Sequence, residues 1–536
     1  MCITRQEKKD LLLSMGENIM RMECQDKLED LIRKERLQIG KGYYLLADDS
    51  ELHDRIADSK NGDFERVRKG LSKIGSIKIG ISRYNFYCLE RMLRYAALVK
   101  GRNITELDSV KLPIFPVSEL YARFIDYVKN LKGIALSLDI EFILHDSELG
   151  EILEKISQYA KENICQEREL VRFLGIISEE AFIGPQTIVF DPYHRCNSNC
   201  MHCWVHTPSI KHPQEFLDRH FDLEIFKHII DDASSMMVDG IILQGDGEPL
   251  MYDKFRDMLR YARSKGLGIL FFTNGILLNE DVAREIIDLE VNEIYCSFPA
   301  GTALTYHKVC AKQPERTFGI ITENLRRLME LRAEAKKSKP RLIISHVIHN
   351  MNYHELVEMA LNDASIRPDA VRYYLIRLDV MNRFLQLSPE EIKSIKEMVP
   401  KISDILHKEK IEFVDNFEFQ LGNYDEKTGA WSKDFFLKNG CTIGWYFNLI
   451  PAKYDMSFCC HLRTVGHVHK KSYKDIWFSK EYKRWRRQAK YLKHNINARF
   501  LNGQLLYDEH CDHCDNHQTL LNNIRKMKEL DLHKYL

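Results

Sequence analysis

The sequence predicts an α/β protein whose central part is an open, partial barrel of six strand–helix units. Six short apolar runs are separated by segments of helical length, and polar or cysteine-rich motifs follow several of them. The runs are TIVFDP (187–192), GIILQG (240–245), GILFFTNG (268–275), EIYCSF (293–298), RLIISHVI (341–348) and VRYYLI (371–376). Buried strands that alternate with helices indicate a parallel sheet. Six units are too few for a closed eight-stranded barrel, so we expect an open one with functional groups at the carboxyl ends of its strands.

The segment before the barrel, residues 1–175, carries apolar residues at helical spacing and no chemical motif. The helical pattern is clearest at Leu28, Leu31, Ile32, Leu89, Leu93, Ala96 and Ala97. Residues 73–81 and 134–144 are possible strands. We interpret this segment as a mostly helical accessory or interaction domain, with a substrate-binding role as the alternative.

The boundaries of the remaining segments follow from changes in the residue pattern. The barrel is expected over 186–410, with a helix at 388–409 near its end. A hairpin at 448–460, turning near Pro451–Asp455, and a basic helix at 471–493 then predict a small domain over 435–518. A helical tail fills 519–536.

Composition excludes several classes of protein. The chain has 536 residues, 44% of them hydrophobic, which is enough to build several packed cores. Lys plus Arg and Asp plus Glu each number 78, so bulk positive charge cannot drive nucleic-acid binding. No uninterrupted apolar run of about 18 residues predicts a membrane span, and the first residues do not resemble a signal peptide. We therefore expect a cytoplasmic protein.

Half of the fourteen cysteines fall into two groups. Without an export signal, grouped cysteines favour a metal or cluster site in a reducing compartment over disulfides. The first group, CNSNCMHC, places Cys196, Cys200 and Cys203 directly after the first predicted strand. Three thiolates on a four-iron cube leave one iron open to a substrate or cofactor, whereas His202 or His206 could complete a zinc site.

This first group resembles the signature of the radical S-adenosylmethionine superfamily, CxxxCxxC with an aromatic residue before the third cysteine. His202 takes the aromatic position. The family places this motif in the loop after strand one of a partial (β/α)6 barrel, as expected here for residues 186–390. The resemblance implies that Cys196, Cys200 and Cys203 bind a [4Fe–4S] cluster whose open iron holds S-adenosylmethionine.

Further residues match positions where the family contacts S-adenosylmethionine. GDGEP (245–249) resembles the family's Gly-rich segment beside the methionine amino group, with Glu248 suited to pair with an ammonium. Asp246 stands where many members have glycine. The implied contacts are His202, Gly245, Asp246, Gly247, Glu248, Pro249, Asn274, Ser297, Ser345, His349 and Asn350. For the last four, local capping or packing is the alternative.

The second group, Cys441, Cys459, Cys511 and Cys514, follows the barrel. Four thiolates can hold zinc or a fully ligated [4Fe–4S] cluster, and CxxC alone favours zinc. The layout resembles the SPASM/twitch extension of radical enzymes: a cysteine before a hairpin, one at its end, a Trp-containing helix and a closing CxxC. The resemblance implies one auxiliary [4Fe–4S] cluster, with Cys459 preferred to Cys460 as the second ligand.

The basic helix carries Trp477, Tyr482, Trp485 and Tyr491 among many cations. Basic and aromatic residues together can bind nucleic acid, but an amphipathic helix that covers the auxiliary site is the interpretation we favour. The nearby histidines are expected to be supporting donors or surface residues, not ligands: His461, His467, His510 and His513.

The resemblance implies reductive cleavage of S-adenosylmethionine to a 5′-deoxyadenosyl radical, which abstracts hydrogen from an unactivated substrate carbon. An external one-electron reductant, ferredoxin- or flavodoxin-like, would supply the electron, and net oxidation or rearrangement would follow. The substrate is a small molecule, which we favour, or a peptide. A zinc-stabilised protein that binds nucleic acid or peptide without radical chemistry is the hypothesis from another class.

Overall fold

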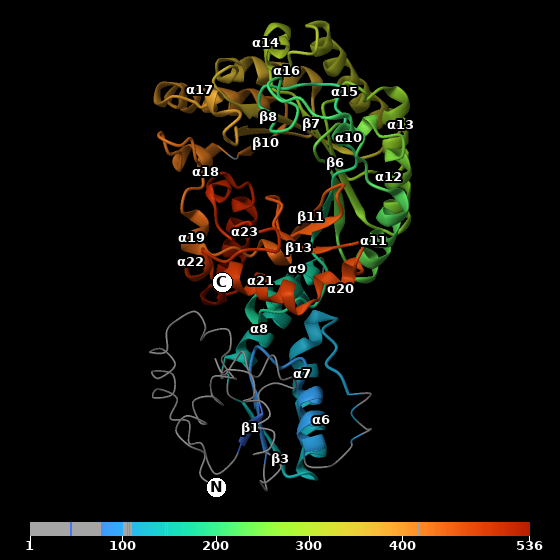
Figure 1. Ribbon diagram of the computed structural model, residues 1–536, viewed down its shortest axis with the longest axis vertical. Coiled ribbons are helices and arrows are strands. Elements are labelled where there is room, and N and C mark those ends of the chain that lie inside the picture. The colour runs from blue at the N-terminus through green and yellow to red at the C-terminus, as the bar shows by residue number, and fades with distance from the viewer. Residues whose placement is uncertain are drawn as a thin grey trace. The chain divides into compact units, whose positions relative to one another are not determined.

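The computed structural model describes residues 43–45, 77–99, 104, 107, 110–144, 146, 148–163, 166–415 and 417–536 (Figure 1). The chain divides into two compact units. One comprises Met1–Ile183 with Asn522–Leu536, and the other comprises Gly184–Leu521. Both cysteine groups therefore lie in the second unit. No helix among the described residues is long and apolar enough to span a membrane.

The first unit contains a parallel sheet as well as helices. The sheet consists of β1 (Tyr43–Leu45), β2 (Ile77–Ile81) and β3 (Ile140–Leu144). The helices are α6 (Leu89–Val99), α7 (Leu120–Leu136), α8 (Leu149–Glu162) and α9 (Glu167–Ser178). The prediction of a helix at Leu89–Ala97 is confirmed, and these apolar residues are buried. The pattern at Leu28–Ile32 lies outside the described residues.

One prediction for this unit is incomplete and one is wrong. Most of the described residues of this unit are helical, as expected, but three strands that pair in parallel are added to the helices. The apolar run 134–144 is not one strand, because its first residues end α7 and only Ile140–Leu144 joins the sheet. Asp139, at φ +51°, makes the turn between them.

The six predicted strands of the barrel are all present. They are β4 (Thr187–Phe190), β5 (Gly240–Leu243), β6 (Gly268–Thr273), β7 (Glu293–Ser297), β8 (Arg341–Ile348) and β9 (Ala370–Leu375). They pair in chain order and all in parallel. The fold is therefore a partial (β/α)6 barrel, whose carboxyl strand ends all lie at one edge.

The principal barrel helices cover one face of this curved sheet (Figure 1). They are α11 (Leu223–Ser235), α12 (Phe255–Ser264), α13 (Glu280–Asp288), α15 (Arg316–Glu334), α16 (Leu356–Ile366) and α17 (Pro389–Lys408), with short α10 (Gln214–Leu217), α14 (Ala303–Val309) and α18 (Phe417–Gly422) between elements. Along β6 every second residue is fully buried, and the others are half-buried. The face of the sheet that the helices cover is thus fully buried, while the concave face keeps some solvent-accessible surface.

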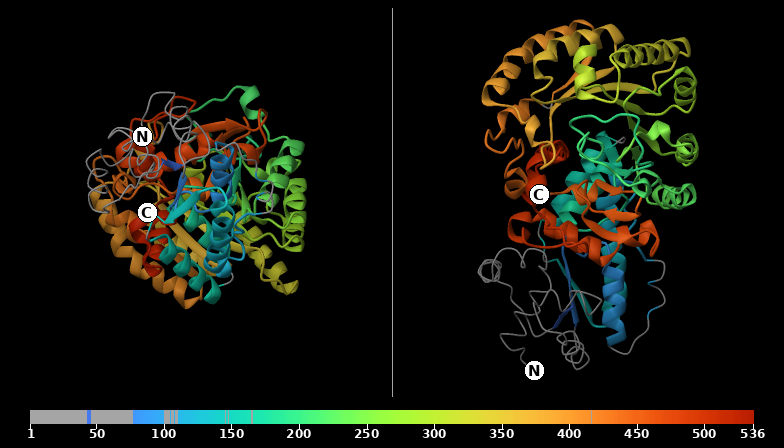
Figure 2. Two further views of the ribbon diagram at one scale, coloured as in Figure 1. Left: turned by 90° about the horizontal axis from the view of Figure 1, so that it is seen from below. Right: turned by 45° about the horizontal axis from the view of Figure 1, so that its top comes forward.

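The sheet is larger than predicted. β10 (Glu412–Asp415) extends it in parallel beyond β9, and β11 (Phe447–Ile450) pairs in parallel with β4. The expected hairpin is present as β11 and β12 (Asp455–Ser457), to which β13 (Thr464–His467) is added antiparallel. The segment that carries the second cysteine group therefore continues the barrel sheet next to its first strand (Figure 2).

The predicted basic helix 471–493 is broken into three: α20 (Tyr473–Trp477), α21 (Lys480–Lys490) and α22 (Leu492–Asn495). Ser472 and Ser479 each cap the start of a new helix, which explains the first break. The remaining helices are α19 (Phe435–Asn439) and α23 (His517–Glu529). The chain leaves the second unit within α23.

Three of the four aromatic residues predicted to matter in this basic segment face the interior. Trp477, Tyr482 and Trp485 are at most 1% exposed, and Trp485 stacks on Phe500. Arg486 is also fully buried, where it donates to two backbone carbonyl oxygens and lies over the Trp477 ring. These rings are unavailable to stack on bases, which supports the covering role over nucleic-acid binding.

Candidate metal centres

The loop after β4 presents the first three cysteines with backbone donors aimed at their sulfur atoms. His206 N and Val205 N donate to Cys203 Sγ at 3.1 and 3.4 Å, and Ser198 N donates to Cys196 Sγ at 3.4 Å. Burial raises the pKa of the Cys196 thiol to about 12 and that of Cys203 to about 11. A buried thiol with so high a pKa loses its proton near pH 7 only when a strong cation lies beside it. The backbone N–H donors favour the charged form of the sulfur. The loop therefore fits a metal cluster.

The histidines of this loop differ in availability. His206 Nε2 lies 2.8 Å from the carbonyl oxygen of His194, so that nitrogen is already engaged. His202 has a buried Nδ1 with no hydrogen-bond partner, and burial lowers its pKa to about 4. His206 is therefore a weaker candidate than His202 for the fourth ligand of a zinc site.

The two glycines of GDGEP allow this segment to pack against the cysteine loop. A Cβ on Gly245 would collide with the side chain of Asp191, and one on Gly247 would collide with the carbonyl oxygens of Tyr193 and Arg195. Close backbone approach therefore excludes any larger residue at both positions.

Glu248 links this segment to the end of β6. Its side chain is buried and accepts hydrogen bonds from Thr273 Oγ1 at 2.7 Å, Asn274 N at 2.8 Å and Leu250 N at 3.2 Å. Burial raises the pKa of Glu248 to about 7, although these hydrogen bonds lower it. Its pairing with an ammonium stays a prediction, and the structure gives this carboxylate a role in holding two loops together. Pro249 begins the short helical turn that follows.

Asn274 lies beside the cysteine loop. Its Nδ2 donates to Asn197 Oδ1 at 2.6 Å and lies 4.0 Å from Cys196 Sγ. Asp246 lies near the same loop, 3.7 Å from His194 Nε2, which in turn lies 2.8 Å from Asp191 Oδ2. Burial and the charge of Asp191 raise the pKa of Asp246 to about 6. The trio of Asp191, His194 and Asp246 was not predicted, although two of its members stand between β4 and Cys196.

The four predicted contacts on the later strands differ in environment. Ser297 and Ser345 are register partners on β7 and β8, and the buried Ser345 Oγ has no hydrogen-bond partner. His349 is buried with its ring 5.6 Å from that of His202, and its Nε2 is also unpartnered. Asn350 instead donates to the carbonyl oxygen of Phe384 at 2.7 Å, which fits the capping alternative.

The second cysteine group converges on one cavity. Its wall includes Cys441, Cys459, Cys511 and Cys514. Cys459 follows β12, and the CxxC pair spans the end of a short helical turn, Glu509–His513. Burial raises the pKa of Cys441 to about 12 and that of Cys511 to about 11, so these thiolates also require a bound cation.

Arg463 bridges two of these sulfurs. Its Nη1 donates to Cys459 Sγ at 3.1 Å and its Nη2 to Cys511 Sγ at 3.3 Å, while Asp508 lies 3.0 Å away. The guanidinium is 3% exposed. A buried cation at two of the expected ligand sulfurs would offset the negative charge of a cluster held there. The sequence carries no motif for this residue beyond its place four positions after Cys459.

Cys459 and Cys460 occupy different positions. Cys459 lines the cavity with the other three cysteines, whereas Cys460 Sγ lies 3.7 Å from Asn516 Nδ2. Cys460, His461 and Cys514 also place their ligand atoms within 4.8 Å of one another. The cavity wall supports the preference for Cys459, which stays a prediction.

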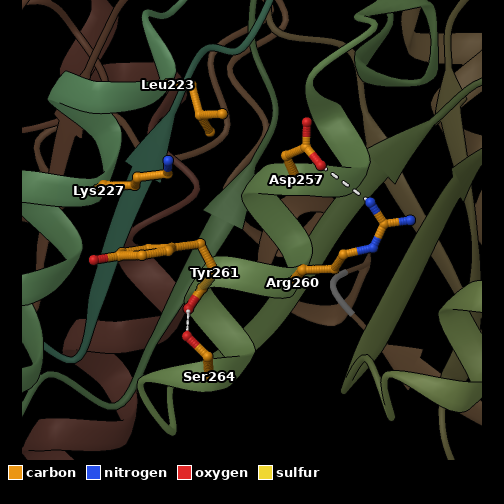
Figure 3. Close-up of a pocket in the computed structure, with 6 residues that line it drawn as sticks. All are labelled: Leu223, Lys227, Asp257, Arg260, Tyr261 and Ser264. Atoms are coloured by element: carbon orange, nitrogen blue, oxygen red, sulfur yellow. Dashed lines mark hydrogen bonds and ion pairs between the residues drawn. The ribbon is translucent and has the colours of Figure 1, made fainter.

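A surface depression between α11 and α12 offers no comparable chemistry (Figure 3). Asp257 and Arg260 form an ion pair at 3.0 Å, and Lys227 pairs with Glu224 at 2.7 Å. Its charged groups are already paired, and it lies on the helices, away from the strand ends.

The family comparisons agree with this geometry. Residues 190–361 match the radical SAM superfamily. The chain therefore contains a radical SAM domain over these residues. Residues 441–515 match SPASM, an iron–sulfur cluster-binding domain. Its cofactors are therefore [4Fe–4S] clusters and S-adenosylmethionine.

Curated relatives are distant. The chain is 25% identical over 308 residues to a tungsten-containing aldehyde ferredoxin oxidoreductase cofactor-modifying protein of Pyrococcus furiosus, covering 54% of this chain and 79% of the relative. It is 29% identical over 107 residues to Fe-coproporphyrin III synthase of Methanosarcina barkeri, covering 20% and 25%. Streptococcus suis SuiB bound to S-adenosylmethionine is similar in structure, with 15% identity, a TM-score of 0.44 and coverage of 74% and 83%.

Proposed function

We propose that Cys196, Cys200 and Cys203 hold the cluster that binds S-adenosylmethionine, and that Cys441, Cys459, Cys511 and Cys514 hold an auxiliary cluster. The observation that carries the proposal is the sheet itself. β4 leads directly into the first cysteine loop, and its neighbour β11 begins the hairpin that leads to Cys459. Two clusters held at adjoining strands would serve one substrate space.

Cys196, Cys200 and Cys203 would hold a [4Fe–4S] cluster at the first loop, and that cluster would supply the electron for reductive cleavage of S-adenosylmethionine and so for hydrogen abstraction from a substrate carbon. The chain's own residues prepare this site. The amide groups of Ser198, Val205 and His206 stabilise thiolate charge, and Glu248 fixes the surrounding loops. His202, whose pKa burial lowers to about 4, is neutral near pH 7 and does not repel a sulfonium cation.

At the second site, Arg463 would balance the charge of the auxiliary cluster. The substrate radical would lose an electron to this cluster, which gives a net oxidation, or the cluster would only shape the substrate space. An external one-electron reductant, ferredoxin- or flavodoxin-like, would supply the first cluster. We place the protein in the cytoplasm.

The substrate we propose is a small molecule. Support comes from the curated relative named for cofactor modification and from the relative named as an Fe-coproporphyrin III synthase. A peptide is the alternative. A further relative is mycofactocin maturase MftC of Mycobacterium tuberculosis, 26% identical over 125 residues.

The decisive experiment is anaerobic reconstitution followed by metal analysis and a 5′-deoxyadenosine assay. We expect about eight irons per chain, as two four-iron clusters. Replacing Cys196, Cys200 and Cys203 together with alanine should remove about four irons and all cleavage of S-adenosylmethionine. Cys88→Ala is the matched control, because Cys88 is a buried cysteine of the first unit. Tightly bound zinc without iron would contradict the proposal.

A further inference from the structure

Two arginines on and just after β9 have no ion-pair partner. Arg372 lies on the strand and Arg377 follows it, and neither forms an ion pair with any residue that the structure describes. Their neighbours are different: Arg332 pairs with Asp369 at 2.5 Å, and Arg367 pairs with Glu409 at 3.4 Å. An unpaired, partly buried cation is unusual. Moving a charged side chain out of water on folding costs free energy, and a nearby anion is what normally offsets this cost.

Arg372 is held on the concave face of the sheet by two aromatic rings. Its Cζ lies 5.1 Å from the ring centroid of Tyr295 and 4.7 Å from that of Tyr374. Its Nε is buried and donates no hydrogen bond. Val371 and Tyr373, the alternate residues of β9, are fully buried. The rings therefore position the guanidinium without neutralising it.

Arg377 lies beside the first cysteine loop. Its Cζ is 5.3 Å from the ring centroid of Trp204, the residue after Cys203. The end of β9 is fixed there by apolar packing, because Met201 of the loop contacts the buried cluster of Val347, Ile376, Leu378 and Leu385. The Trp204 side chain is 54% exposed, so its ring is open to a bound molecule.

We propose that Arg377, with Arg372 on the strand that leads to it, binds an anionic group of the substrate, a carboxylate or a phosphate, beside the first cysteine loop. The inference rests on the proposed function and deepens it by naming the substrate class. Guanidinium groups suit both anions, because their planar N–H donors match two oxygens at once. Trp204 would cover an apolar or planar part of the same molecule.

Tryptophan fluorescence can test this site without a known substrate. The chain has five tryptophans, and Trp431, Trp445, Trp477 and Trp485 are at most 1% exposed. The difference between the wild-type protein and Trp204→Phe therefore isolates Trp204. The protein, with its clusters, is quenched anaerobically with anionic iodide and with neutral acrylamide.

We expect Arg377→Gln to reduce iodide quenching of Trp204 by about fourfold, the effect of one unit charge about 5 Å away in water. Acrylamide quenching should not change. Arg377→Lys should keep most of the iodide effect, and Arg367→Gln, which removes a paired charge, should keep all of it. Arg372→Gln should weaken protection by the anions named below.

Competing anions distinguish a phosphate from a carboxylate as the group that this site binds. Inorganic pyrophosphate that shields Trp204 from iodide would indicate a phosphate, and succinate that does so would indicate a carboxylate. Shielding by neither, or iodide quenching that is unchanged in both Arg372→Gln and Arg377→Gln, would overturn the proposal. Because the readout needs no cleavage of S-adenosylmethionine, a zinc-bound chain that still concentrates iodide would contradict the proposed function alone.

Discussion

Cys200 and Cys310 face each other across an antiparallel bridge with their sulfur atoms 3.4 Å apart. Cys310 follows α14 and is 1% exposed, and Met201 N donates to Val309 O at 2.8 Å in the same pairing. The middle of the cysteine loop is thus attached to a segment about a hundred residues away. A fourth thiol stands beside the first group although it belongs to no motif.

Cys310→Ala should keep the full iron content of about eight per chain, because the three loop cysteines are the expected ligands. Cys200→Ala should instead lose about four irons. Metal analysis of both reconstituted variants checks this. If the Cys310 variant also lost four irons, Cys310 would be a ligand and our assignment of the open iron would be wrong.

Replacing Cys511 and Cys514 with alanine should remove the auxiliary cluster and leave the first one. Cleavage to 5′-deoxyadenosine should continue uncoupled, with little product, since the two groups use separate ligands. Iron content, electron paramagnetic resonance and product analysis measure this. Loss of both clusters with precipitation would mean that the second site is structural.

Arg463→Gln should make the auxiliary cluster harder to reduce, because the buried guanidinium stabilises the more negative, reduced state. A charged hydrogen bond contributes about 1.5–3 kcal/mol, and so we expect the potential to fall by roughly 60–130 mV. A redox titration followed by electron paramagnetic resonance measures the shift. Arg499→Gln, which removes an exposed cation of the same domain, should leave the potential unchanged.

Glu248 should make stability depend on pH. Its pKa is raised by burial to about 7 in the folded chain, above the unfolded value of 4.5. The folded state therefore binds more protons between these values, and this contribution is lost as pH rises from about 4.5 to about 7. Glu248→Gln should remove a pH dependence of up to about 3 kcal/mol. Urea unfolding of both proteins at pH 5 and pH 7.5 tests this, and parallel pH profiles would contradict it.

Removing residues 1–183 together with 522–536 should leave both clusters, because all seven proposed ligands lie within Gly184–Leu521. Substrate turnover should fall, since an open barrel protects a radical poorly from water. Removing 1–183 alone should give a less soluble protein, because Met527 and Tyr535 would lose their buried environment. Iron analysis and turnover check this, and full turnover by the doubly shortened chain would refute it.

The sequence predicted what local patterns encode. The six β-branched runs became β4–β9, and GDGEP lies against the cysteine loop because glycines permit close approach. It could not predict the parallel pairing of β11 with β4, since Phe447 and Thr187 meet only through tertiary packing. Arg463, Cys310 and the contact of Trp204 with Arg377 are likewise products of the fold.

The pairing of β11 with β4 determines how far apart the two cysteine groups lie. Thr187 to Phe190 align with Phe447 to Ile450 through continuous backbone hydrogen bonds, with no hinge between them. The sheet therefore fixes the separation of the two cysteine groups, and the protein cannot adjust this distance to the length of a bound substrate. We expect substrates to be selected by length as well as by charge. A substrate too short to reach from the first cluster site to the second would react at the first site without transferring an electron to the auxiliary cluster.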